Sequence, residues 1–184
     1  MSKPVGVFAV EARHGWNDLA LEAAKECLKL PLRESDYDGP EELKYVPAIP
    51  YQRLAQYHYR CGEAGRGVCK SRHWIGEEWE RKMYCSTCAP TPGLYWKNPA
   101  GIHVRVTHPI PPWFKGLLES MEEKFAVIPA PVDEPLLLMR AMDGVPNCPS
   151  CRGKVQGFLP EFLSATLPPK ITSEIAKIEL KFEL

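Results

Sequence analysis

Two Cys-x-x-Cys pairs, Cys85/Cys88 and Cys148/Cys151, constrain this chain more than any other feature. A tetrahedral metal site needs four ligands, and two such pairs supply them from two short loops. The second pair is surrounded by Asn, Pro, Ser and Gly, which suit a tight turn whose backbone amides can face the sulfurs. The sequence therefore predicts a structural metal site with four cysteine ligands and no open coordination position.

Zn²⁺ is the expected ion, because four thiolates are a common zinc ligand set. An iron–sulfur cluster is the alternative cofactor, since it also binds four thiolates. Redox-active dithiols are a third interpretation, but that motif normally begins a helix beside a βαβ unit, which neither pair does convincingly. A possible second metal site, with suitable ligand types and an unusual gap, comprises His58, Cys61, Cys69 and His73.

Composition predicts a cytoplasmic protein. The 184 residues are 45% hydrophobic, which permits a core, but no apolar run approaches the roughly 20 residues of a membrane span. The first residues lack the apolar stretch of a secretory signal peptide. In a reducing compartment the seven cysteines are expected to be thiols or metal ligands rather than disulfides.

Short apolar segments separated by proline-rich stretches predict an α+β fold. We expect a small mixed sheet with short helices, whose second half is stapled by a zinc-ribbon-like or treble-clef-like metal site. Helices are predicted at 17–28, 51–59, 76–84 and 113–125, and Cys27 is expected to be buried on the apolar face of the first. Strands are predicted at 5–10, 136–142, 155–159 and 176–184, together with a hairpin over 94–107.

An acidic stretch at 34–42 marks a predicted boundary between two parts of the chain. Residues 1–42 would form an N-terminal βα segment that packs on the main domain. Residues 43–184 would form the metal-stapled α+β domain with a C-terminal strand. That strand, 176–184, alternates apolar and charged residues, so we expect it to pair within the chain or with a partner chain.

Charge is unevenly distributed, although 23 basic and 23 acidic residues leave the chain neutral. No Asp or Glu occurs between Glu80 and Glu119, where cations alternate with aromatic residues. Such a surface suits nucleic acid, because cations contact phosphates and rings stack on bases, and a basic patch can equally dock an acidic protein. The alternative is that the rings belong to the core and the cations to a solvated face. The candidate partner-binding residues are Arg81, Lys82, Tyr95, Trp96, Lys97, His103, Arg105, Trp113 and Lys115.

These features favour a non-catalytic zinc-binding interaction protein that presents residues 81–118 to nucleic acid or to an acidic protein partner. A structural or assembly component, or an inhibitor, of a larger protein complex is a second hypothesis, suggested by the exposed prolines, the aromatic content and the regular final strand.

A third hypothesis is enzymatic. The order Cys-x-x-Cys, His108-Pro109, then the second pair with Lys154 loosely resembles zinc-stapled HNH endonucleases over 85–154. The resemblance implies a metal-dependent nuclease in which His108 is the general base that activates water. The chain departs from that family at Arg152, where a second histidine is expected, and at Thr107, where an Asp or His should precede His108.

Overall fold

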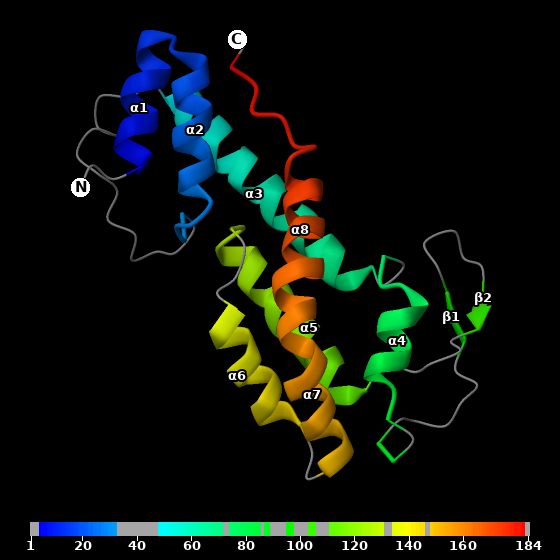
Figure 1. Cartoon of the computed structure of the whole chain (residues 1–184). Helices are drawn as coiled ribbons and strands as arrows, with labels where there is room; N and C mark the ends of the chain where they lie inside the picture. The colour runs from blue at the N-terminus through cyan, green and yellow to red at the C-terminus, as the bar shows by residue number, and fades with distance from the viewer. Residues whose placement is uncertain are drawn as a thin grey trace. The chain divides into compact units, whose positions relative to one another are not determined.

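The computed structural model is built mostly of helices (Figure 1). It describes residues 4–32, 48–71, 74–85, 87–88, 95–97, 103–105, 111–130, 134–145 and 148–182. The helices are α1 (Pro4–His14), α2 (Asn17–Cys27), α3 (Ala48–Lys70), α4 (Glu77–Met83), α5 (Pro112–Val127), α6 (Glu134–Gly144), α7 (Pro149–Glu161) and α8 (Leu167–Ile175), with a π-helical segment η2 (Phe162–Thr166) between the last two. Two short strands, β1 (Tyr95–Lys97) and β2 (His103–Arg105), form an antiparallel hairpin.

The predicted α+β fold with a small mixed sheet is wrong. Segments 5–10, 136–142 and 155–159, predicted as strands, lie in helices α1, α6 and α7. Buried residues in these helices repeat at helical spacing, as Val155, Phe158 and Leu159 do in α7. A short apolar run fits a buried strand or a buried helix equally well, and here helical packing decides.

Four predicted helices are confirmed, and α3 extends beyond the predicted 51–59 at both ends. Cys27 is buried, as expected. The hairpin is also confirmed, with Tyr95 opposite Arg105, Trp96 opposite Val104 and Lys97 opposite His103. The predicted final strand finds no partner strand within the described part of its own chain, because 178–182 join no sheet. The alternative, that it pairs with a partner chain, stays a prediction.

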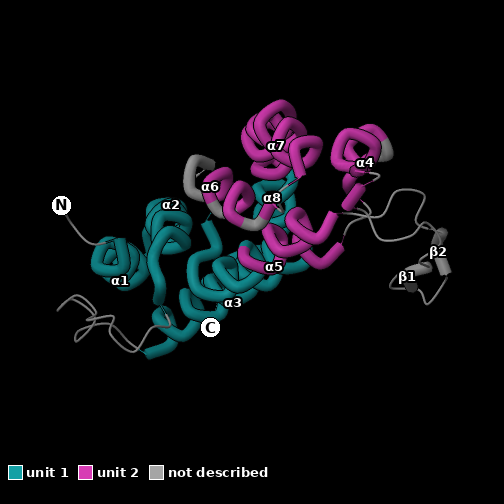
Figure 2. The backbone as a smooth tube through the Cα atoms, turned by 90° about the horizontal axis from the view of Figure 1, so that it is seen from below, with its two compact units in different colours: residues 1–68, 121–131, 170–184 teal, residues 69–120, 132–169 magenta. Residues whose placement is uncertain are grey.

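The chain divides into two compact units (Figure 2). Unit 1 comprises residues 1–68, 121–131 and 170–184, and unit 2 comprises 69–120 and 132–169. The boundary predicted at residue 42 lies outside the described residues. The predicted βα segment before it is instead a pair of helices, α1 and α2, which pack against each other in unit 1. Gly15, with φ of 74°, makes the turn between them, a backbone conformation that glycine adopts without steric strain.

The core of unit 1 is formed by the apolar faces of α1, α2 and α3. Alanines at positions 20, 23 and 24 keep the buried face of α2 flat, so a neighbouring helix can approach closely. His58 of α3 is the one buried polar side chain among the described residues. Its Nε2 donates a hydrogen bond to the carbonyl of Leu30 at 2.8 Å, so the cost of burying the ring is offset.

Two glycines in α3 allow the end of α5 to approach very closely within unit 1. A Cβ at Gly62 would lie 2.6 Å from the backbone oxygen of Phe125, and a Cβ at Gly65 would lie 2.9 Å from the Phe125 ring. Arg66 of α3 adds an ion pair to Glu122 of α5 at 3.3 Å. The contact between these helices therefore depends on the missing side chains of Gly62 and Gly65.

We predict opposite effects for two glycine-to-alanine changes in α3. Gly62→Ala should lower the free energy of unfolding by about 2 kcal/mol, because a backbone oxygen cannot move aside as a side chain can. Gly67→Ala, exposed and with nothing within 4 Å of the new Cβ, should raise it by about 0.5–1 kcal/mol. Urea unfolding followed by circular dichroism measures both, and equal effects would contradict the close approach.

Candidate metal centre

The two Cys-x-x-Cys pairs lie where loops meet helices. α4 ends at Met83, and Cys85 follows two residues later in a tight turn closed by the Cys88 amide, which donates to the Cys85 carbonyl at 3.2 Å. Cys148 is the N-cap of α7, and Cys151 lies in the first turn of that helix. Neither pair lies in a strand. The expected zinc-ribbon-like or treble-clef-like setting in a mixed sheet is therefore wrong.

The predicted clustering of the four cysteines is confirmed. Their Sγ atoms all lie within 4.8 Å of one another, and those of Cys85 and Cys148 are 3.8 Å apart. A tetrahedral site with metal–sulfur bonds of about 2.3 Å separates its sulfurs by about 3.8 Å. All four cysteines are free thiols; Cys88 is half-buried and the other three are buried. The donor set and its spacing thus fit a single tetrahedral ion.

Local hydrogen bonds favour a thiolate at Cys85, whereas hydrogen bonding to Cys148 and burial raise the pKa of Cys88. Burial alone would raise the pKa of Cys85, but hydrogen bonds from the backbone amides of Cys88 and Thr87, and from the Cys151 and Ser150 side chains, lower it to about 6. The pKa of Cys151 is instead raised, first by burial and then by the neighbouring thiols. Four sulfurs this close cannot all carry negative charge unless a cation lies among them.

The positive end of a helix lies at the second pair. Cys148 and Cys151 lie at the N-terminus of α7, where unpaired backbone N–H groups point outward and favour negative charge. Pro149 suits the first helical position because its fixed φ matches the helix and no N–H is lost there.

An aromatic cluster in unit 2 holds together α4, which ends just before the first pair, and α7, which begins at the second pair. Phe162, fully buried, contacts Trp79 of α4 and Phe114 of α5 with ring centroids 5.3 and 5.4 Å apart. Phe158 of α7 contacts Trp79 at 6.2 Å and Trp113 at 6.3 Å. Edge-to-face and tilted contacts of this kind add to the apolar burial of each ring. α4 and α7 are therefore packed together beside the four sulfurs.

One lysine links α7 directly to α4, the helix that ends just before Cys85. Lys154 of α7, three residues after Cys151, donates from Nζ to the carbonyl of Lys82 at 3.0 Å. The carbonyls of the last turn of a helix lack helical partners, and a cation suits that negative end. Lys154 therefore ties the end of α4 to α7. In the sequence, Lys154 lies beside the second cysteine pair. Its partner, the carbonyl of Lys82, lies 72 positions away in the chain, so the residue spacing alone could not predict this hydrogen bond.

The predicted partner-binding residues lie in different environments in the structure. Trp113 is only 3% exposed and lies in the aromatic cluster, so it cannot stack on a partner. Lys82 pairs with Glu78 at 2.9 Å and lies over the Trp79 ring, and Lys115 pairs with Glu119 at 3.4 Å. Arg81 is exposed on α4. The remaining five, Tyr95, Trp96, Lys97, His103 and Arg105, lie on the two strands of the hairpin.

The possible second metal site does not assemble among the described residues. Within that part of the chain, the four-cysteine cluster is the only group of at least three metal-ligating side chains close enough to share an ion. His58 hydrogen-bonds a backbone carbonyl, and burial raises the pKa of Cys61 to about 11. Cys69 is buried at the end of α3. His73, and the nuclease candidate His108, lie outside the described residues.

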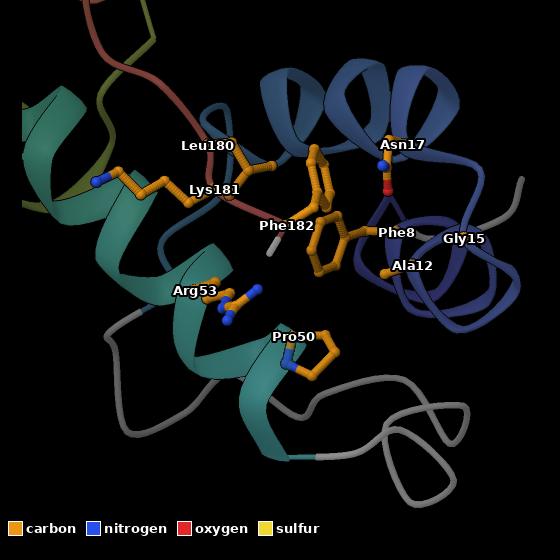
Figure 3. A pocket seen from close by; sticks show the side chains of 9 residues that line it. All are labelled: Phe8, Ala12, Gly15, Asn17, Pro50, Arg53, Leu180, Lys181 and Phe182. Atoms are coloured by element: carbon orange, nitrogen blue, oxygen red, sulfur yellow. The ribbon is translucent and has the colours of Figure 1, made fainter. Parts of the chain in front are cut away.

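A cavity of about 220 Å³ lies in unit 1, far in sequence from the cysteine pairs (Figure 3). Phe8, Pro50 and Phe182 form much of its apolar wall, and Arg53 lines it as well. It holds none of the candidate metal or partner-binding residues, but Leu180, Lys181 and Phe182 of the predicted final strand line it.

Comparison with protein-family models, with curated proteins and with solved structures finds no match for this chain. None of the described helices combines the length and apolar composition that crossing a bilayer requires.

Replacing Lys154 tests whether α4 is tied to α7 as described. Lys154→Met removes a charge-assisted hydrogen bond and should lower the free energy of unfolding by about 1–2 kcal/mol. Lys115→Met is the matched control, because its ion pair is more than half exposed and should contribute at most about 0.5 kcal/mol. Urea unfolding at a fixed metal concentration measures both, and equal losses would contradict the assigned role.

Proposed function

We propose that the protein is a non-catalytic module built around a structural zinc ion held by Cys85, Cys88, Cys148 and Cys151. The observation that carries the proposal is the mutual proximity of the four sulfurs, all within 4.8 Å. Four protein ligands leave no coordination position for substrate or water, so the ion would stabilise the fold rather than act on a substrate.

The spacing of the sulfurs favours zinc over an iron–sulfur cluster. A cluster places several iron and sulfide atoms between its cysteines, so those cysteine sulfurs stand farther apart than the ligands of a single ion. The 3.8 Å between Cys85 and Cys148 suits one ion. Zinc also accepts a tetrahedral thiolate set without a redox step.

Metal content and stability should change together when one ligand is removed. Purified protein should contain one zinc ion per chain by elemental mass spectrometry, and Cys88→Ser should abolish that content and lower the melting temperature. Binding energy is folding energy at such a site, so a chelator should reproduce the loss of stability in the unsubstituted protein.

Cys27→Ala is the matched control, because Cys27 is a buried cysteine outside the cluster. It should keep full zinc content even though it loses some packing. Iron in the purified protein, or no metal in any preparation, would contradict the zinc proposal.

We further propose that the hairpin that follows the first pair presents a basic face to nucleic acid. In an antiparallel pair, opposite residues share a face and successive residues alternate. Tyr95, Lys97, His103 and Arg105 therefore belong to one face of the hairpin, while Trp96 and Val104 belong to the other. Three residues that can carry positive charge together with one aromatic residue suit phosphates and an unpaired base.

The salt dependence of DNA binding tests this second proposal. We expect labelled single-stranded DNA to bind with an affinity that falls as salt rises, because bound cations release counterions from the phosphates. Lys97→Gln with Arg105→Gln should weaken binding at low salt and reduce the slope of log K against log salt by about one per lost contact. Fluorescence anisotropy at several salt concentrations measures both.

Lys25→Gln is the control, since it removes one exposed positive charge from α2 in unit 1. It should leave the slope unchanged. Binding that ignores salt, or that is equal in all variants, would contradict the assignment. If the protein binds an acidic peptide but not DNA, the partner of this hairpin face is an acidic protein rather than nucleic acid.

A further inference from the structure

Residues 178–182 form an extended segment after α8 that packs on unit 1 without joining a sheet (Figure 1). Ile178, Leu180 and Phe182 are partly buried against the core of α1, α2 and α3. Glu179 and Lys181, between them, are exposed. Figure 3 shows Phe182 on the side of Phe8 and Lys181 directed away from it. The segment therefore has the two-faced character of a strand, with helices in place of sheet neighbours.

The backbone of this segment is only partly used. Arg60 of α3 donates to the carbonyl of Glu179 at 3.4 Å. Within the described part of the chain, residues 179–182 make no backbone–backbone hydrogen bond. In an extended chain the N–H and C=O of one residue point to one edge, and those of its neighbours point to the other. The Ile178 N–H already donates to the Ile175 carbonyl at 2.9 Å. The edge opposite Arg60 thus belongs to the backbone groups of Leu180 and Phe182 and to the carbonyl of Ile178.

A backbone edge of this kind can pair with another strand. The charged side chains of Glu179 and Lys181 determine which partner strand and which register are favourable. If the segment meets a copy of itself antiparallel, with Leu180 opposite Leu180, each Glu179 stands opposite Lys181 of the other copy. Ile178 then stands opposite Phe182. A register centred on Glu179 or Lys181 instead places like charges opposite each other, which is unfavourable. The sequence is self-complementary about Leu180.

The exposed charges are available for this pairing. Lys177, just before the segment, is engaged with Glu174 at 2.6 Å. Glu179 and Lys181 have no side-chain partner among the described residues. Directly opposite residues of an antiparallel pair have Cβ atoms about 5 Å apart, so Glu179 and Lys181 of two copies would be close enough to pair.

We propose that residues 178–182 pair with the same residues of a second copy of this chain, antiparallel and centred on Leu180. The backbone groups of Leu180 face the partner, so two Leu180 residues would exchange both of their hydrogen bonds. The apolar side chains keep their contacts with their own unit 1, and the two Glu179–Lys181 pairs fix the register. The partner is thus a second copy, because the charge pattern matches itself.

A charge-exchange experiment tests the pairing without disturbing the core. Sedimentation equilibrium of the full chain should show concentration-dependent dimers. Glu179→Lys and Lys181→Glu should each raise the dimer dissociation constant roughly tenfold, because each converts two attractive pairs into two repulsive ones. The double variant, carrying both changes, should dimerise like the unsubstituted chain. An equimolar mixture of the two single variants should form heterodimers.

Lys25→Glu, the same charge change on α2, is the control and should leave the dissociation constant unaltered. The expected pattern is weaker dimerisation in each single variant and restored dimerisation in the double variant and in the mixture. Only residues that lie opposite each other across the two copies produce this pattern. A monomer at all concentrations would overturn the proposal, and so would a dimer that is unaffected by the single variants. Both outcomes are independent of metal content, so they leave the zinc proposal standing.

Discussion

The close approach of two helix ends at four sulfurs is the constraint on which unit 2 depends. Cys85 and Cys148 are 63 residues apart in sequence, yet their Sγ atoms lie 3.8 Å from each other. The hairpin, α5 and α6 lie between them in sequence. By analogy with a disulfide, cross-linking a loop of this length restricts the unfolded chain by about 4 kcal/mol. The aromatic cluster and Lys154 hold the same helices, so packing and ligation would reinforce each other.

The sequence predicted this cluster because its signal is local. Two thiols three residues apart can face one ion whatever surrounds them, so the ligands were predicted although the secondary structure around them was not. The strands failed for a related reason. Runs such as 155–159, Val-Gln-Gly-Phe-Leu, are too short for hydrophobic periodicity to distinguish a strand from a helix. Residues 155–159 are helical because Phe158 packs against Trp79 and Trp113, which are distant in sequence.

The stretch between Glu80 and Glu119 contains no acidic residue, yet two of its lysines form ion pairs because they lie on helices. Neighbours on a helix surface are three or four residues apart. Lys82 therefore meets Glu78, and Lys115 meets Glu119, from just outside the stretch. Trp113, counted as a surface ring, packs in the core. On the hairpin, the neighbours of Lys97 and Arg105 across the strands are His103 and Tyr95, so an i+4 acidic partner does not arise there in the same way.

The alternating segment at 176–182 shows what period-two hydrophobicity specifies. Alternation requires one buried face, and a surface of helices provides that as well as a sheet does, as Ile178 and Leu180 show. It does not require a hydrogen-bonded neighbour in the same chain. The pattern correctly predicted an extended, half-buried chain at 178–182, whereas Ala176 and Lys177 form an exposed turn after α8. What remains is a row of backbone donors and acceptors that must be satisfied by water or by another strand. The alternating signs of Glu179 and Lys181 narrow that choice, because a paired strand must place a basic residue opposite Glu179 and an acidic residue opposite Lys181.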